Sequence, residues 1–252
     1  MSNEDKSILQ SVDNALQILD LFEINNELGV TEISRLISCG KSTAFRLTTT
    51  LENRGFIIKK TNGKFVLGAR LLTLGTIAKE RVEIIHVFKQ ELIQLAEDTK
   101  EIAYLYIWAD QYHVISIDKV SKQIISGYDS TLLKPQYPHQ TSAGKVLLAA
   151  KSDDYIQNYV DDVPLNGQTP FSNIEAQELW HNLEEIRVVE YAIDEQQHKI
   201  GYTSIAVVVK NTNGLVIGAI SISGPHDRIK MKSEYIITKL KASAERIQKR
   251  PI

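Results

Sequence analysis

One stretch of the sequence, residues 42–54, carries hydroxyl, amide and guanidinium side chains in a pattern suited to hydrogen bonding with nucleic acid. At about 100° per residue, a helix places these polar side chains in one arc of about 120° that contains no apolar residue. Ala44, Leu47 and Leu51 gather on another face, which predicts the core-facing side. Such polar side chains bind phosphate oxygens and base edges, so the pattern predicts a DNA-reading helix. The polar arc consists of Ser42, Thr43, Arg46, Thr49, Thr50 and Asn53.

Basic residues are concentrated around this helix. Residues 31–70 carry eight Lys and Arg against two Glu, a net charge of +6. Residues 1–30 carry one Lys against six acidic residues, and the whole chain has a net charge of −2. A basic segment of this kind in a slightly acidic protein predicts a polyanion-binding surface.

Four of these lysines have positions that suit contact with DNA. Lys41 stands at the predicted helix start, beside backbone N–H groups that favour phosphate. Lys59, Lys60 and Lys64 belong to a predicted hairpin whose Asn62-Gly63 turn favours type I′ geometry. Together with Asn62, they are expected to reach the adjacent DNA backbone or minor groove.

The elements that must position this surface follow in the order of a winged helix-turn-helix. Apolar residues recur at helical spacing over residues 12–22, and Thr31 is expected to N-cap a short second helix. Residues 38–40 read as a tight turn, and Gly55 ends the helix over residues 42–54. The hairpin over residues 56–67 then forms the wing.

The rest of the chain predicts an α+β domain with antiparallel strands. Residues 69–99 are helical in period, with a break near Gly75 or Val82–Glu83. Strands flanked by turns alternate with helices that lie apart from them, which excludes an alternating parallel sheet. We expect domains at residues 1–68 and 86–252, joined by a linker helix at 69–85. The strands are expected at 102–108, 113–120, 203–209 and 215–223, and the helices at 142–151, 153–160, 174–188 and 233–249.

Composition excludes several classes of protein. The apolar share of 43% and charged share of 24% are typical of a globular chain. No apolar run approaches the roughly 18 residues of a membrane span, and the polar start MSNEDK does not resemble a signal peptide. The single cysteine, Cys39, excludes an intramolecular disulfide and a cysteine-pair zinc site. We therefore expect a cytoplasmic protein with no membrane partner, no metal and no cofactor.

Motifs over almost the whole chain, in the right order, resemble the IclR-type transcriptional regulators. The resemblance implies an effector-responsive transcription factor with a GAF-like C-terminal domain, and a homodimer or dimer of dimers on a palindromic double-stranded DNA operator. The N-terminal motifs are residues 28–36 (LGVTEISRL), 41–47 (KSTAFRL), 51–56 (LENRGF), 64–68 (KFVLG) and 71–75 (LLTLG). The C-terminal motifs are residues 137–149 (YPHQTSAGKVLLA), 191–201 (YAIDEQQHKIG) and 217–225 (IGAISISGP).

The same resemblance implies an effector site for a small carboxylate. The backbone N–H groups of Ser142 and Ala143, at a helix start, would bind the carboxylate. Asp194 and Ser204 would bond the other polar end of the ligand. The floor would be formed by Ser221 and Ser223, alternate residues on one strand, and the apolar walls by Ile125, Tyr128 and Tyr202.

Five positions depart from the family pattern. Glu190 replaces a common glycine, Gln196-Gln197 an acidic pair, Ser204 a frequent cysteine and Val208 a frequent proline. The loss of negative charge and of a thiol argues against glyoxylate or pyruvate as the effector. A sugar acid or another hydroxylated carboxylate stays open.

Two other classes of protein compete with a repressor. A hydrolase with an appended winged helix would use Ser142 and His139, with His198 and Asp194, but no Gly-x-Ser-x-Gly elbow is present. His139 is instead expected in the core or a loop, and His198 at the surface. A winged helix used for protein contacts is disfavoured because the polar arc contains no aromatic or aliphatic anchor.

Overall fold

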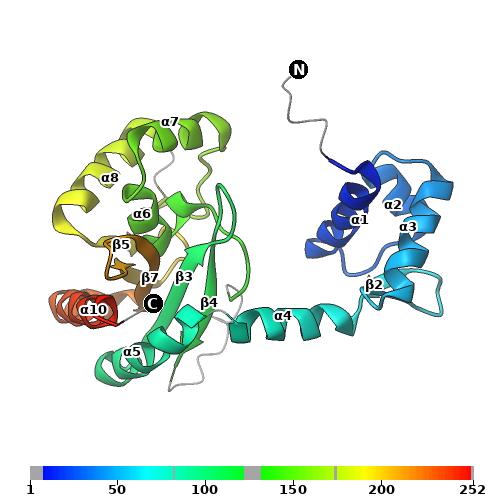
Figure 1. Ribbon diagram of the computed structural model, residues 1–252. Coiled ribbons are helices and arrows are strands. Elements are labelled where there is room, and N and C mark those ends of the chain that lie inside the picture. Colours follow the sequence, from blue (N-terminus) through cyan, green and yellow to red (C-terminus); the bar gives the residue numbers. More distant parts are fainter. Residues whose placement is uncertain (1–7, 82, 122–131, 173–174, 251–252) are drawn as a thin grey trace. The chain divides into compact units, whose positions relative to one another are not determined.

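The computed structural model describes residues 8–81, 83–121, 132–172 and 175–250 (Figure 1). The chain divides into two compact units, Met1–Arg81 and Val82–Ile252. Within the described residues, no helix combines the length and the apolar character that a bilayer crossing requires.

The first unit is a winged helix-turn-helix, as predicted. Its core joins side chains from the helices and the hairpin, among them Ile18, Ile33, Ala44, Ile57 and Phe65, so the three helices and the wing pack as one body. The two short strands pair antiparallel, with Ile58 opposite Val66. In chain order the elements are α1 (Gln10–Asp20), η2 (Leu21–Glu23), α2 (Val30–Leu36), α3 (Lys41–Asn53), β1 (Ile57–Lys59), β2 (Phe65–Leu67) and α4 (Ala69–Arg81).

The expected N-cap of α2 is wrong by two residues. Gly29, not Thr31, occupies the N-cap position, with an extended backbone. The N–H of Gly29 donates to the Glu32 carboxylate over 2.7 Å. That carboxylate, three residues on, satisfies the exposed helix end as the acid of a capping box does, and Thr31 lies inside the helix.

The expected type I′ turn of the wing is also wrong. Gly63 alone adopts a positive φ, of 80°, whereas Asn62 does not. The N–H of Gly63 donates to the Lys60 carbonyl over 3.0 Å, and that of Lys60 to the Lys64 carbonyl over 2.7 Å. This is a three-residue loop built on a type I turn followed by a left-handed glycine. The Asn62 side chain stabilises it by accepting from the Lys64 N–H.

The second unit is an antiparallel sheet of five strands in the order β4-β3-β7-β6-β5, which confirms the predicted α+β class. β7 and β6 form its centre with β3, and Ser204 of β6 lies opposite Ser223 of β7. The short edge strand β5 was not predicted as a strand. The strands are β3 (Ile102–Trp108), β4 (Val114–Val120), β5 (Ala192–Glu195), β6 (Tyr202–Lys210) and β7 (Val216–Pro225).

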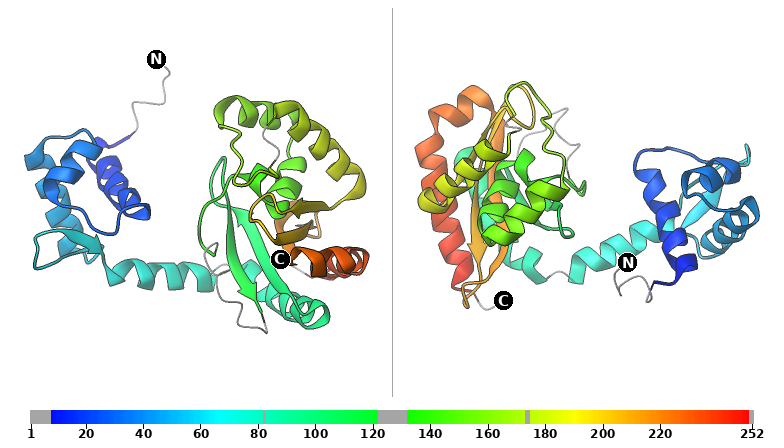
Figure 2. Two further views of the ribbon diagram at one scale, coloured as in Figure 1. Left: turned by 180° about the vertical axis from the view of Figure 1, so that it is seen from behind. Right: turned by 90° about the horizontal axis from the view of Figure 1, so that it is seen from above.

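Helices cover both faces of this sheet, as Figures 1 and 2 show. One core contains Leu147 of α6 and Leu183 of α8 with Ala206 of β6. The other contains Phe88 of α5 and Leu240 of α10 with Ile205, the next residue along β6, because neighbouring strand residues face opposite sides. The helices are α5 (Glu83–Thr99), η4 (Pro138–Gln140), α6 (Ser142–Ala149), α7 (Asp153–Asp162), α8 (Ala176–Val189), α9 (His226–Met231) and α10 (Ser233–Gln248).

The expected helical break is not at Gly75, which lies inside α4. α4 is described to Arg81 and α5 from Glu83, and the other expected position of the break, Val82–Glu83, includes a residue outside the described part of the chain. Helix α9, of six residues, was not predicted.

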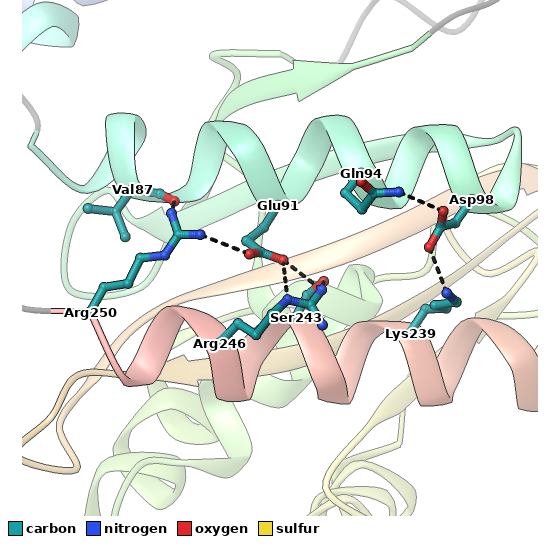
Figure 3. A network of polar contacts seen from close by, with 8 residues as sticks. All are labelled: Val87, Glu91, Gln94, Asp98, Lys239, Ser243, Arg246 and Arg250. Carbon is teal, nitrogen blue, oxygen red and sulfur yellow. Dashed lines mark hydrogen bonds and ion pairs between the residues drawn. The ribbon is translucent and has the colours of Figure 1, made fainter.

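A polar network ties α5 to α10 along one side of the unit (Figure 3). The carboxylate of Glu91, 6% exposed, accepts two bonds from Arg246, at 3.0 and 2.7 Å, and one from Arg250 at 3.1 Å. Arg250 also donates to the Val87 carbonyl, and Arg246 to the Ser243 hydroxyl. The last helix therefore fixes the first half of α5 through a buried carboxylate.

Glu91→Gln is expected to destabilise the fold by about 1–2 kcal/mol, because it leaves two guanidinium groups without their anion. Both arginines reach water, which limits the loss. Urea unfolding followed by circular dichroism measures the change. The matched control is Asp98→Asn, which breaks the more exposed pair with Lys239 and is expected to cost less than about 1 kcal/mol. Equal losses in the two variants would contradict the account.

Candidate functional site

The polar arc predicted on the third helix lies on the outer face of α3. Lys41, its first residue, follows the N-cap Gly40. Ala44, Thr48 and Leu51 are buried on the opposite side. The structure therefore gathers the predicted DNA-contacting residues on one solvent-facing surface. Ser42, Thr43, Arg46, Thr50 and Asn53 are exposed, and Thr49 is half-buried.

Two hydroxyls of this surface are already engaged within the helix. Thr49 donates to the Phe45 carbonyl and Thr50 to the Arg46 carbonyl, each over 2.8 Å. In this conformation they present acceptor lone pairs and methyl groups outward. Phe45, which sequence reasoning missed, flanks the arc and is 55% exposed. An exposed ring at this position is suited to contact a thymine methyl group.

The wing lysines have acidic partners that sequence reasoning also missed. Lys60 lies 3.2 Å from a Glu27 carboxylate oxygen, and Lys64 lies 3.5 Å from Glu32. Hydrogen bonds from Lys60 and Asn62 hold the pKa of Glu27 below its ordinary value, although partial desolvation opposes them. Lys59 lies over the Phe65 ring, 5.9 Å from its centroid. The positive charge of the wing is therefore partly neutralised by its own domain.

Glu27→Gln is expected to strengthen DNA binding by this unit several-fold, because it frees Lys60 for phosphate and removes one of the two carboxylates beside Lys64. The slope of log K against log salt concentration should become more negative by about one to two. Fluorescence anisotropy of a labelled duplex at several salt concentrations measures both quantities. Glu23→Gln removes the same charge from η2 and serves as control. Identical salt slopes in the two variants would show that the wing lysines do not contact phosphate.

In the second unit, the start of α6 opens toward a cavity. Thr141 is the N-cap, and its hydroxyl accepts from the Gly144 N–H over 2.9 Å. The N–H groups of Ser142 and Ala143, the first two of the helix, have no partner within it. A Cβ on Gly144 would lie 2.3 Å from the Pro138 carbonyl oxygen. Glycine is therefore required there to bring α6 against η4.

The cavity brings together six of the nine predicted effector residues: Ser142, Ala143, Asp194, Ser204, Ser221 and Ser223. It has about 20 Å³ of room, enough for about one water molecule. Tyr202 does not line it, and Tyr128, like Ile125, lies outside the described residues. Four lining residues were missed: Tyr104, Tyr106, Thr141 and His198. Tyr104 could have been found from the strand register, because it lies opposite Ser221 on the neighbouring strand.

Tyr202, which the family resemblance suggests as an apolar wall, does not line the cavity. It shares a face of β6 with Ser204, but it is the first residue of the strand and pairs with Pro225. Its ring lies under the Lys199 ammonium, 4.8 Å from nitrogen to centroid. The side chain therefore lies at the end of the strand, not among the residues that line the cavity.

Buried polar groups surround the cavity. The Ser142 and Ser204 hydroxyls are 2.7 Å apart. Asp194, 3% exposed, accepts from the N–H groups of Gln197 and His198 over 2.7 and 3.2 Å. Burial raises the pKa of Asp194 to about 6, although the nearby Lys145 charge and those N–H groups oppose the rise. The carboxyl therefore keeps its proton to a higher pH than an exposed aspartate does.

Lys145 is a buried cation on α6, beside this carboxylate. Burial lowers its pKa, and the charge of Asp194 partly restores it. Its ammonium donates to the side-chain oxygen of Gln197. Gln197 is one of the two positions where the family pattern has an acid, so here a neutral amide is the lysine's hydrogen-bond partner.

The expected surface position of His198 is wrong. The residue is half-buried, and desolvation holds the pKa of its ring below the ordinary value. It lines the cavity because two N–H bonds to Asp194 turn the chain inward at this point. Its Nε2 lies 3.3 Å from the Gln136 amide nitrogen, and its Nδ1 has no hydrogen-bond partner among the described residues.

The catalytic triad of the alternative hydrolase hypothesis is not assembled. Both ring nitrogens of His139 have other partners, the Tyr159 hydroxyl at 2.5 Å and the Asn166 carbonyl at 3.3 Å. The Ser142 hydroxyl contacts Ser204 instead. In the described part of the chain, no group of three His, Cys, Asp or Glu side chains is placed to hold a metal ion.

Comparisons with known proteins agree with this architecture. The model of the IclR helix-turn-helix domain matches residues 11–59, and that of the bacterial transcriptional regulator IclR C-terminal domain matches residues 77–249. The HTH-type transcriptional regulator XynR of Escherichia coli is 32% identical over 224 residues, 88% of each chain. The transcriptional repressor IclR of the same organism is 25% identical, over 88% of this chain and 82% of its own.

Among solved structures, an IclR homologue from Microbacterium hydrocarbonoxydans in complex with 4-hydroxybenzoate superposes with a TM-score of 0.79. The two sequences are 20% identical, and the match covers 94% of this chain and 97% of that structure's chain. At this identity the comparison shows that the fold is shared. The two family models together span most of the chain, and the relatives are named as transcriptional regulators, not as enzymes. The chain therefore belongs to the IclR family of DNA-binding transcriptional regulators, which carry a ligand-binding C-terminal domain.

Proposed function

We propose that this protein is a repressor whose operator binding is modulated by a small carboxylate. The observation that carries the proposal is the cavity at the start of α6, where two backbone N–H groups, several hydroxyls and a buried carboxyl converge. A helix start favours an anion, and the hydroxyls supply orientation. Support for a repressor comes from the relative named as one, and support for a carboxylate from the relative crystallised with 4-hydroxybenzoate.

On the DNA side, the proposal assigns the outer face of α3 to the major groove. Arg46 is the side chain able to bond a guanine edge or a phosphate, and Lys41 neutralises phosphate at the helix start. The wing contributes Lys59, Lys60 and Lys64 to the flanking backbone. The remaining contacts are assigned to Ser42, Thr43, Thr49 and Thr50.

On the ligand side, the Ser142 and Ala143 N–H groups bind the carboxylate. Asp194 and Ser204 bond the ligand's other polar end, and Ser221 and Ser223 form the floor. Because the cavity holds only about one water molecule, the ligand has to separate the Ser142 and Ser204 hydroxyls when it enters. This rearrangement is the step that we propose couples binding to a changed dimer geometry, in which the two recognition helices lose their spacing of about 34 Å.

The proposal includes a homodimer, alone or as a dimer of dimers. Leu9, at the N-cap of α1, and Val12 and Leu16, four residues apart within it, are 71%, 52% and 56% exposed. A row of large exposed apolar side chains on one helix face favours burial against an identical face, as in a two-fold dimer. Two identical DNA-binding units read an inverted repeat.

Isothermal titration calorimetry with small carboxylates tests the ligand site. Pyruvate, 4-hydroxybenzoate and D-gluconate are the probes, each against the purified full chain. For whichever probe binds the wild type, Ser204→Ala is expected to lower the affinity about tenfold, which is the effect of losing one hydrogen bond. Thr203→Val, which removes a hydroxyl from the opposite face of β6, should leave that affinity unchanged. Equal effects of the two substitutions, or no binding of any carboxylate, would overturn the site.

A further inference from the structure

A second hollow adjoins the small cavity, and one residue lines both. It is an open groove of about 520 Å³. His198 belongs to the wall of the groove and to the wall of the cavity. The groove is lined by His113, Lys134, Pro135, Gln136, Tyr137, Gln140, Asn166, Gln168, His198 and Lys199.

Most of the lining residues carry polar side chains, Pro135 and the Tyr137 ring add apolar surface, and no lining residue is a carboxylate. Two lysines contribute positive charge, and four amide side chains contribute donors and acceptors. Three of the amides form a chain: Gln168 donates to Gln140 over 2.9 Å, and Gln140 donates to Asn166 over 3.2 Å. Each amide has two N–H donors and two lone pairs, so each retains hydrogen-bonding capacity for a ligand. This chemistry favours a hydroxylated anion over an apolar or a cationic molecule.

At the junction of the two hollows, two buried polar atoms are unsatisfied. Gln136 is 8% exposed, and its side-chain oxygen has no hydrogen-bond partner among the described residues. The same holds for Nδ1 of His198, to which Gln136 is joined through the other ring nitrogen. A buried polar group without a partner is unfavourable, and a ligand hydroxyl satisfies it.

We propose that the cavity and the groove form one elongated effector site, which takes a polyhydroxylated carboxylate of sugar-acid type. The carboxylate lies at the start of α6, the first hydroxyls bond His198 and Gln136, and the distal hydroxyls bond the amide chain of Gln140, Asn166 and Gln168. The inference rests on the proposed function, because it places the anion in the same cavity. It adds the ligand's length and its hydroxylated character, which the cavity alone does not specify.

Calorimetry on the full chain tests the inference with five probes. D-Gluconate and D-galactonate carry both features, hexanoate has the carboxylate without hydroxyls, D-sorbitol has hydroxyls without the carboxylate, and pyruvate is short. At least one aldonate is expected to bind about tenfold or more tightly than hexanoate or sorbitol, since each lacks one set of hydrogen bonds.

A groove variant separates the two halves of the site. Gln140→Leu with Gln168→Leu should weaken aldonate binding by about tenfold and leave the affinity for pyruvate unchanged. The matched control is Gln157→Leu, an exposed amide on α7 that does not line the groove. Gln136→Leu, which removes the unsatisfied oxygen, is expected to weaken aldonate binding at least as much. Circular dichroism verifies that each variant is folded.

The outcomes distinguish the inference from the function on which it rests. If pyruvate binds and both aldonates bind no better than hexanoate, the elongated site is wrong and the carboxylate cavity stands. If an aldonate binds and the groove variants bind it as tightly as Gln157→Leu does, the groove is not part of the effector site. If no carboxylate binds, the proposed effector site fails together with the groove.

Discussion

Replacing both Val12 and Leu16 by glutamate is expected to convert the protein into a monomer and to weaken its binding to an inverted-repeat duplex by about a thousandfold or more. Both side chains are large, apolar and more than half exposed on α1. Two carboxylates at these positions would face two more across a two-fold axis, where neither could be solvated. A monomer retains one recognition helix, so it keeps little more than the charge-driven affinity for DNA.

Sedimentation velocity measures the oligomeric state, and electrophoretic mobility shift measures the affinity. Ile24→Glu is the matched control, since Ile24 is 89% exposed in the same unit but lies outside α1. It adds a negative charge to the same unit without touching the α1 face. A double variant that remains dimeric would show that the copies associate elsewhere. A double variant that is monomeric and keeps its operator affinity would contradict operator binding by a dimer.

The second large effect concerns Asp194 and pH. Effector affinity is expected to fall as the pH rises through about 6, by up to about tenfold per pH unit. The buried carboxyl titrates at about 6. Its neutral form tolerates an anionic ligand in the same cavity, whereas its ionised form repels one. Ligand binding therefore takes up a proton, and the affinity is highest below the pKa.

Two neighbouring groups act on the same equilibrium. Lys145 faces Asp194 from α6 and attracts the ligand anion, and the pKa of Lys145 is lowered by burial. His198 becomes cationic only below its ordinary range, because burial lowers its pKa too. Its protonation strengthens anion binding in the same direction, at lower pH. Asp194→Asn should therefore flatten the profile between pH 6 and pH 8 and leave the dependence below pH 6.

Calorimetry from pH 5 to pH 8 on the wild type and on Asp194→Asn measures these profiles. A wild-type profile as flat as that of the variant would exclude Asp194 from the ligand's surroundings. Asp194→Ala goes further, because it removes the acceptor that holds the Gln197 and His198 N–H groups. That variant is expected to lose the ligand response while its DNA affinity without ligand is kept. If Asp194→Ala abolishes DNA binding outright, the residue is structural and the site is misplaced.

Much of the fold was predictable because local periodicity determines it. The polar arc of α3 and the buried position of Ala44 follow from a 3.6-residue repeat, and both lie where the sequence placed them. The serines of the cavity were predictable for a related reason. Alternation along β7 puts Ser221 and Ser223 on one face. Family resemblance then identified the helix start that faces them.

The remainder depends on contacts between residues far apart in the chain. Glu27 neutralises Lys60 from 33 positions away, and Glu91 pairs with Arg246 from 155 positions away, distances at which local patterns carry no signal. His198 is expected at the surface from the sequence, but its backbone N–H donates to the Asp194 carboxylate, and this contact turns the chain inward. The wing's turn type was misjudged because Asn62 uses its side chain, not a left-handed backbone, to stabilise the loop.

Selection of bound sequences from a random duplex DNA library by the purified full chain tests the central claim most directly. We expect enrichment of an inverted repeat whose half-sites are about one helical turn apart, as a dimer with two α3 helices requires. Arg46→Ala, carried through the same selection, should lose the preference at one base pair of each half-site. Enrichment of no sequence, or of a single unrepeated motif, would contradict a dimeric, sequence-specific regulator.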